Sequence, residues 1–256
     1  MSLSDLVQIA VEQGKIPRYL YKYTPLNDKT KKIITENELW FSTPTDFNDP
    51  FDCKISSDTN ISEYDLITYI KETRPNMTDF EVEKYAENLK DKIGDYIQES
   101  IDSIINKAGI CCFSEINDSI LMWSHYANNH TGICLKFDIL SDPDFFISPL
   151  RMVYKDTYST INFLKEPKKC VEELIKSKHI GWSYEKEIRV YKPNEGNQVI
   201  KFAKSSLVEV IFGCRSDKKE VEEFIKLIKD NEFNSTKLIF AKPSKEKYEL
   251  EFKEYK

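Results

Sequence analysis

The chain has 256 residues, which is enough for one large domain or two small ones. Hydrophobic residues (40%) and aromatic residues (12%) are sufficient for a substantial core, and 31% charged residues favour a well-solvated surface. The net charge of -6 argues against strong nucleic-acid binding, which requires a basic face, and no apolar run approaches the ~20 residues that cross a bilayer, so we expect no membrane partner.

The N-terminal quarter predicts two helix–strand units followed by a loop. In chain order these are a helix over 4–13 that stops at Gly14, a strand over 19–24, a helix over 28–37 and a strand over 39–43. Residues 44–52, PTDFNDPFD, read as a loop because two prolines and an Asn-Asp-Pro turn leave little alternative.

Residues 62–107 carry apolar residues at helical spacing, interrupted at Pro75 and ended by Gly109. We interpret them as a helical insertion within one domain that spans residues 1–256.

The second half alternates strands and helices without a regular βαβ repeat. The predicted strands cover 109–115, 132–138, 150–154, 185–191, 197–203, 207–213, 237–242 and 248–253, and the predicted helices cover 120–129, 168–179 and 216–230. This order favours an α+β fold with a mixed or antiparallel sheet.

Cysteine and glycine usage narrows the chemistry. Of six cysteines, Cys111, Cys112, Cys134 and Cys214 lie in apolar, strand-like runs, where a reduced thiol behaves as a small hydrophobe. No Cys–His nucleophile pair and no zinc spacing is expected, and the N-terminus lacks an apolar signal region, so we expect a cytoplasmic protein. The chain has seven glycines and no glycine-rich phosphate loop, so a bound nucleotide must be held in another way.

Three stretches are candidates for a site. The first is the loop that contains Asp46, Asn48, Asp49 and Asp52, whose oxygen atoms suit a cation or a ribose. Its spacing does not match a calcium loop, and a turn in which these side chains cap their own backbone explains the same composition.

The second candidate is the segment MWSHYANNH. Trp123 and Tyr126 share one helical face, and His125 shares another with Asn129. The pattern is typical of an aromatic core stripe beside a surface histidine. The functional alternative is a planar ligand stacked on Tyr126 or Trp123, with its polar edge held by His125 or Asn129.

The third candidate is GWSYEKEIRVY (181–191). On an extended strand Glu185, Glu187 and Arg189 project from one face, with the two carboxylates about 6–7 Å apart. Such a set is either a solvated edge or the acidic centre of an active site.

In order along the chain, these stretches resemble an uncharacterised bacterial family. The motifs that carry the resemblance are LYKYTPL, LWFSTPTDFNDPF, GICCFSE, LMWSHYANNHTGICLKFD, HIGWSYEKEIRVY and VEVIFGC. They cover most of residues 18–215 outside the helical insertion.

More distantly, the chain resembles the ADP-ribosyltransferase superfamily, which implies a split α+β sheet and NAD as cofactor. By this resemblance Lys22 stands where the family has a histidine, and Ser42 or Ser114 matches the serine of the middle motif. The Glu185-Lys186-Glu187 unit matches an E-x-E pair, with Glu187 stabilising the transition state and Glu185 positioning an acceptor.

The same resemblance implies NAD contacts from further residues. Tyr23 or Tyr126 stacks on nicotinamide, and Arg189 binds pyrophosphate. Trp123 and His125 complete the expected nucleotide contacts, and Asn48 and Asp49 support the site from their loop.

These observations predict an ADP-ribosyl transferase or NAD glycohydrolase, in a toxin or phage-defence setting, with a nucleotide substrate, an unidentified macromolecular acceptor and no metal. Two alternatives stay open. One is a metal-dependent nuclease or hydrolase that uses the acidic loop 46–52 and Glu185. The other is a non-catalytic module that binds a nucleotide or a peptide.

Overall fold

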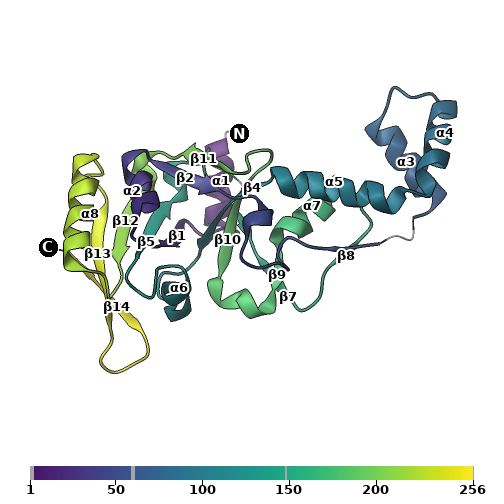
Figure 1. The fold of residues 1–256 in the computed structure, drawn as a ribbon. Helices are drawn as coiled ribbons and strands as arrows, with labels where there is room; N and C mark the ends of the chain where they lie inside the picture. Colours follow the sequence, from purple (N-terminus) through teal and green to yellow (C-terminus); the bar gives the residue numbers. More distant parts are fainter. Residues whose placement is uncertain (1–2, 59–60, 148, 256) are drawn as a thin grey trace.

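The computed structural model describes residues 3–58, 61–147 and 149–255. Its largest feature is an eight-stranded sheet with the order β14-β13-β12-β5-β1-β4-β10-β6 (Figure 1). The strands are β1 (Tyr19–Thr24), β4 (Gly109–Ser114), β5 (Ile133–Asp138), β6 (Leu150–Arg151), β10 (Glu187–Lys192), β12 (Leu207–Phe212), β13 (Lys237–Pro243) and β14 (Leu250–Glu254). Only β12 and β13 pair in parallel within this sheet, which confirms the predicted α+β class with a mostly antiparallel sheet.

One face of this sheet carries the main hydrophobic core. The helices α1 (Leu3–Glu12), α2 (Asp28–Thr35) and α8 (Lys218–Asp230) pack there, together with the side ribbon of β2 (Glu38–Phe41) and β11 (Gln198–Lys201). Strand alternation sends Leu20, Phe113 and Ile188 into this core. The neighbouring residues of the same strands therefore point to the opposite face, where the site lies.

The sheet opens between β1 and β4. These strands share a single registered pair, Tyr21 with Ser114, whereas β1 pairs with β5 and β4 pairs with β10 over six positions each. Beyond that pair the two strands are free to part, and side chains rather than backbone hydrogen bonds occupy the opening.

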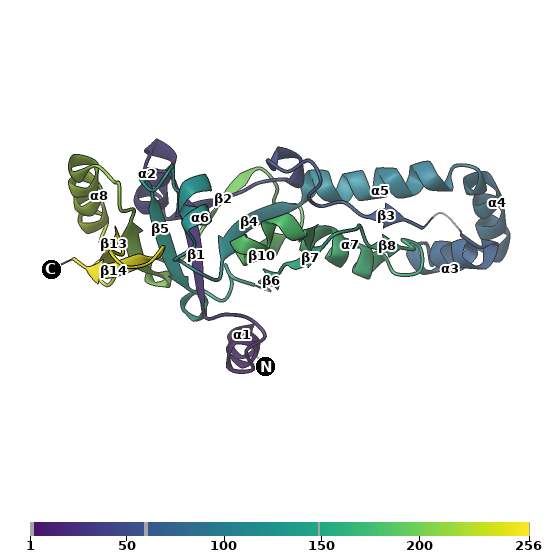
Figure 2. The same ribbon diagram turned by 90° about the horizontal axis from the view of Figure 1, so that it is seen from below.

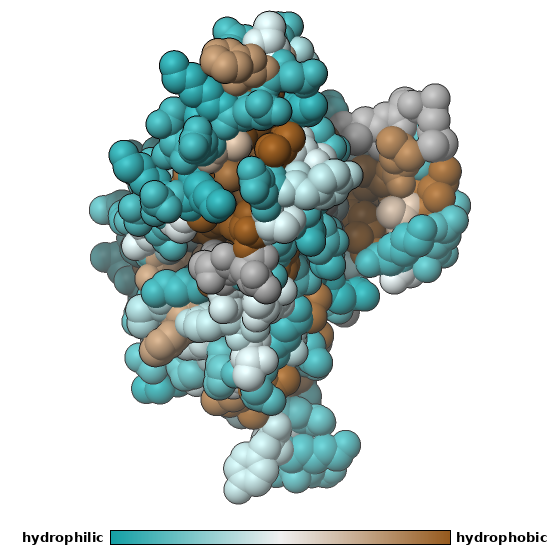
Figure 3. All heavy atoms as spheres, turned by 90° about the vertical axis from the view of Figure 1, so that its right-hand side faces the viewer, coloured by the Kyte–Doolittle hydropathy of each residue, from teal (hydrophilic) through white to brown (hydrophobic). Residues whose placement is uncertain are grey.

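A helical arm projects from one end of the molecule (Figures 1 and 2). It consists of α3 (Glu63–Thr73), α4 (Asp79–Lys90) and α5 (Ile93–Lys107), and Ser62 and Thr78 begin the first two helices with capping boxes. Its core, which includes Ile70 and Ile97, continues onto α7 (Pro167–Lys176). Seen from the arm, the surface is mostly hydrophilic, with apolar atoms showing in a hollow (Figure 3).

Short elements complete the chain. The small pairs are β3 (Ser56–Ser57) with β8 (Thr160–Ile161) and β7 (Val153–Lys155) with β9 (Ser177–His179), and 3-10 turns form at Pro44–Asp46, Ile139–Ser141, Ile180–Glu185 and Lys204–Ser206. Within the described residues, no helix combines the length and the apolar character required to cross a membrane.

Several predicted elements have different bounds, and three of these differences lie around the site. The helix predicted over 120–129 is α6 (Ile120–His125), because Asn128, Asn129 and His130 have positive φ angles of 47°, 54° and 69°, which a right-handed helix excludes. The helix predicted over 168–179 ends at Lys176, and β9 takes its last residues.

The strand predicted over 185–191 begins at Glu187. The residues before it form the 3-10 helix η3 (Ile180–Glu185), and Lys186 follows in the left-handed conformation. Strand alternation is therefore the wrong explanation for how Glu185 and Glu187 come to share a face.

Candidate functional site

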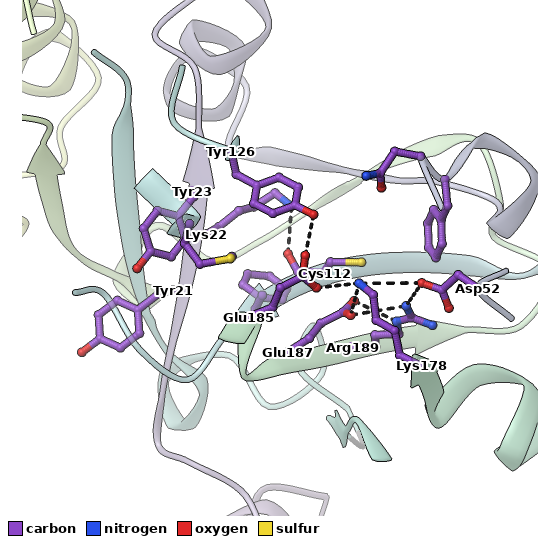
Figure 4. A pocket seen from close by; sticks show the side chains of 14 residues that line it. Tyr21, Lys22, Tyr23, Asp52, Cys112, Tyr126, Lys178, Glu185, Glu187 and Arg189 are labelled. Carbon is purple, nitrogen blue, oxygen red and sulfur yellow. Dashed lines mark hydrogen bonds and ion pairs between the residues drawn. The ribbon is translucent and has the colours of Figure 1, made fainter. Parts of the chain in front are cut away.

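A cavity of about 140 Å³ lies on the face opposite the main core, where β1 and β4 part (Figure 4). Strands β1, β4 and β10 form its floor, and the end of α6, the loop after Pro44–Asp46, β9 and η3 surround it. Its lining residues include Lys22, Tyr126, Lys178, Glu185 and Glu187. The cavity is polar at its base because these charged side chains project from otherwise buried elements.

Lys178 of β9 is the centre of a buried ion cluster. Its Nζ lies 2.5 Å from an Oε2 of Glu185 and 2.9 Å from Oε2 of Glu187, and Asp52 lies 3.8 Å away. Arg189 bonds the far side of the cluster, 2.8 Å from Glu187 and 2.5 Å from Asp52. Three carboxylates thus share two cations in the interior, so removing one cation leaves a carboxylate without compensation.

The turn between η3 and β10 aims both glutamates at Lys178. Lys186 adopts φ 47° and ψ 48°, which reverses the chain for one residue between Glu185 and Glu187. The Ser114 hydroxyl donates to the Glu185 carbonyl, and the Glu187 N–H donates to the Tyr154 hydroxyl. The two carboxylates are held by backbone contacts on both sides of this turn.

Arg189 is fully buried and does not have the expected role. Its guanidinium donates to Glu187, Asp52, the Ile175 carbonyl and the Cys53 sulfur. These contacts engage every nitrogen of the group, so no N–H remains for a pyrophosphate. The structure uses Arg189 to hold carboxylates in place.

The protonation of the cluster follows from these contacts. Burial raises the pKa of Glu187, but Arg189 and Lys178 lower it more strongly, to about 2. Burial lowers the pKa of Lys178, and Glu187 and Glu185 raise it above its ordinary value. Burial and the hydrogen bond to Glu185 raise the pKa of Tyr126, whose hydroxyl therefore stays protonated and donates to Glu185 at 2.5 Å.

Two other expected residues line the cavity in different ways. Lys22 donates to the Cys112 carbonyl at 3.1 Å, and no carboxylate in the described part of the chain lies within ion-pair distance of its ammonium group. Tyr23 is only 8% exposed, and its hydroxyl donates to the Ile116 carbonyl. Lys22 is thus available to an anion, whereas Tyr23 offers only part of its ring.

Several expected residues lie outside the cavity. Ser42 forms an isolated bridge with Ile110, and Ser114 is buried beneath Glu185. Trp123 is fully buried, with its indole N–H on the Asn117 carbonyl. His125 is exposed at the surface, where its ring nitrogen bonds the Tyr184 hydroxyl at 3.0 Å. None of these four side chains is placed to contact a ligand in the cavity.

The acidic loop does not form an open cation site. Asp46 accepts from the Thr43 hydroxyl, Asp49 accepts from the Phe51 N–H, and Asp52 joins Arg189. In residues 3–58, 61–147 and 149–255 no group of three His, Cys, Asp or Glu side chains has a geometry that could hold a metal ion. Asn48 of this loop lines the cavity, whereas Asp49 faces a neighbouring one.

Lys178 is a residue of the candidate site that the sequence patterns did not indicate. It lies near the end of the helix predicted over 168–179 and carries no motif, and its partners are brought to it by the pairing of β7 with β9 and by the turn at Lys186. No local signal in the sequence identifies such a residue.

A cysteine–histidine contact was also not expected. Cys214 lies beyond the end of β12, with its Sγ 3.8 Å from Nδ1 of His130, and Nε2 of the same ring lies 3.1 Å from the Ser124 hydroxyl. Burial raises the pKa of the Cys214 thiol. The thiol is therefore not activated as a nucleophile despite the contact.

Comparison with known families gives a match over part of the chain. A model described as "Protein of unknown function (DUF2971)" matches residues 122–190, which run from α6 into β10 and contain Tyr126, Lys178, Glu185 and Glu187. Comparisons with curated proteins and with solved structures give no significant match. The resemblance to an uncharacterised family is thus confirmed over residues 122–190, and these comparisons give no support to the resemblance to ADP-ribosyltransferases: the part of the chain that carries most of the ion cluster matches a family of unknown function.

Proposed function

We propose that the cavity binds NAD and that the chain cleaves its nicotinamide–ribose bond, transferring ADP-ribose to an acceptor or to water. The observation that carries the proposal is the pair of carboxylates on one lysine at the opening between β1 and β4. Negative charge held in a buried site stabilises a ribosyl cation more than the neutral ground-state sugar. The single registered pair between β1 and β4, Tyr21 with Ser114, leaves the sheet open next to Glu187, which pairs with Ser114 from β10.

The assignment of the two glutamates is the reverse of that predicted from the sequence. Glu187 has both oxygens in contact with cations, whereas Glu185 has one oxygen on the neutral Tyr126 hydroxyl and shares Lys178 through the other. Glu185 therefore retains more charge for a ligand, and it is the better candidate for stabilising the cation. Glu187 acts as a positioning residue through Lys178 and Arg189.

The reaction balances without a further reagent. The bond from the ribose carbon to the nicotinamide nitrogen breaks, and nicotinamide leaves with the bonding electrons. Water or the acceptor forms the new bond to the same carbon and gives its proton to a carboxylate or to solvent. The ammonium group of Lys22 donates to the Cys112 carbonyl and has no carboxylate partner in the described part of the chain, so it is suited to a phosphate of NAD, a role that needs no glycine-rich loop.

Nicotinamide release from NAD by the purified chain is the direct test. We expect Glu185→Gln to slow release about 100-fold, the usual cost of removing one electrostatic stabiliser. Glu209→Gln is the matched control, because it removes a partly buried carboxylate from the ion pair with Lys136 on the same sheet, outside the cavity. The proposal fails if NAD is neither bound nor consumed, with or without added acceptors.

Full pairing of Glu187 favours one alternative, a nucleotide-binding module without catalysis. In that case NAD binds, no nicotinamide appears, and Glu185→Gln changes only the affinity. Equilibrium dialysis beside the release assay separates the two functions.

A further inference from the structure

A second cavity of about 830 Å³ lies against the ion cluster. It shares Asn48 and Lys178 with the smaller cavity, so the two cavities lie side by side. Its walls come from the loop after Pro44–Asp46, the loop after β7, strand β9 and η3. The chemistry proposed for the two glutamates does not require this second cavity.

Aromatic rings line the second cavity and remain open to solvent. Phe51 is 65% exposed and Tyr158 is 45% exposed, and Trp182 of η3 lies beside them. Nζ of Lys178 lies 5.2 Å from the centroid of the Trp182 ring, so this ring stands directly at the border of the two cavities. Rings gathered around a concave space are suited to stacking on a planar ligand.

One lysine of the second cavity is available to an anion. Its charged lining consists of Lys54, Lys155, Lys178, Asp49 and Asp156. Lys155 and Lys178 are held by carboxylates of the protein. Lys54 is exposed, and no carboxylate in the described part of the chain pairs with it. One cation thus remains available at the rim, in a chain with a net charge of -6.

The volumes of the two cavities suit the two halves of a dinucleotide. A space of about 140 Å³ holds one small ring, whereas ligand pockets for whole cofactors usually measure roughly 300–1,000 Å³. We propose that the second cavity binds an adenylate group, with its base against Phe51, Tyr158 and Trp182 and its phosphate at Lys54. The proposal rests on the proposed function only in taking this adenylate to be half of NAD.

Titration with AMP tests the site directly. We expect Phe51→Ala and Trp182→Leu each to weaken AMP binding about tenfold or more, because stacking on a base is worth at least one factor of ten. The matched controls are Phe80→Ala on α4 and Trp40→Leu on β2, which remove rings that are 74% and 50% exposed and lie outside the cavity. Both controls should bind AMP as the unmodified chain does.

Two further probes locate the phosphate and the other half of the ligand. Lys54→Gln should weaken AMP binding and leave adenosine binding unchanged. Nicotinamide mononucleotide should bind the Phe51→Ala variant as it binds the unmodified chain, because its ring belongs to the smaller cavity. The proposal is overturned if AMP does not bind, or if its affinity is the same in Phe51→Ala and Phe80→Ala.

The outcome for this site is separable from the outcome for the proposed function. If AMP binding depends on Phe51 but the unmodified chain does not release nicotinamide from NAD, the adenylate site stands and the enzyme proposal fails. If nicotinamide is released with an unchanged KM in Phe51→Ala, the enzyme proposal stands and the adenylate site is overturned.

Discussion

Glu187 ties the stability of the molecule to pH. Glu187 is only 4% exposed, and its carboxylate contacts Arg189 and Lys178. These two cations lower its pKa from 4.5 in the unfolded chain to about 2. Because the folded pKa is the lower one, the stabilisation is fully present above pH 4.5. It is lost as the pH falls towards 2, and the shift corresponds to about 3 kcal/mol.

Replacement of Glu187 by Gln should remove this part of the acid sensitivity. Between pH 6 and pH 2 we expect the free energy of unfolding to fall about 3 kcal/mol less in Glu187→Gln than in the unmodified chain. Urea denaturation at a series of pH values measures it. Glu99→Gln, on the exposed side of α5, should follow the unmodified curve. Parallel curves for the Glu187 variant and the unmodified chain would contradict the ion-pair account.

The candidate glutamates could be selected from the sequence, but their environment could not. Two acids and an arginine at alternate positions of an apolar strand indicated a shared face, and this grouping agrees with the contacts around Lys178. Their burial depends on Lys178 of the short strand β9 and on Asp52, which reaches the cluster from a loop 137 residues before Arg189. Local pattern carries no information about such tertiary partners, so a solvated edge and a buried cluster look alike in sequence.

At the scale of elements, strands of the sheet were predicted well because they are buried on one face and flanked by turn residues. Two of the errors occur where the backbone takes left-handed conformations, at Asn128–His130 and at Lys186. Residues other than glycine rarely adopt these backbone angles, and hydrophobic periodicity does not predict them. The turn at Lys186 is nevertheless what directs Glu185 to its lysine.

The turn makes a prediction about backbone strain. Lys186 is exposed and has a φ angle of 47°. This left-handed conformation destabilises a residue that has a Cβ by about 1–2 kcal/mol, whereas glycine adopts it without steric strain. Lys186→Val should therefore be less stable than Lys186→Gly by about 1–2 kcal/mol in urea denaturation, and its nicotinamide release should fall because Glu185 is displaced. At Lys201, exposed on β11, the order should reverse because valine favours strands. Equal stabilities of the two Lys186 variants would argue against a left-handed residue.

At the scale of the whole molecule, α7 connects the core of the helical arm to the sheet. Cys170 and Leu174 of α7 belong to the core of the helical arm, whereas the next residue, Ile175, packs against the sheet and accepts a hydrogen bond from Arg189. The far end of the arm, where Ile70 is buried between helices, has no such link (Figure 2). A disturbance at the far end of the arm should therefore affect the site less than a disturbance in α7.

Leu174→Ala and Ile70→Ala test this route. Both remove a buried side chain from the same core, at an expected cost of about 2–5 kcal/mol. In hydrogen exchange, Ile70→Ala should speed amide exchange in α3 and α4 and leave β10 unchanged, because the arm opens by itself. Leu174→Ala should also speed exchange in β10 and weaken AMP binding, because the Ile175 carbonyl and Arg189 lose their fixed position. Equal protection of β10 in the two variants would show that α7 does not couple the arm to the carboxylates.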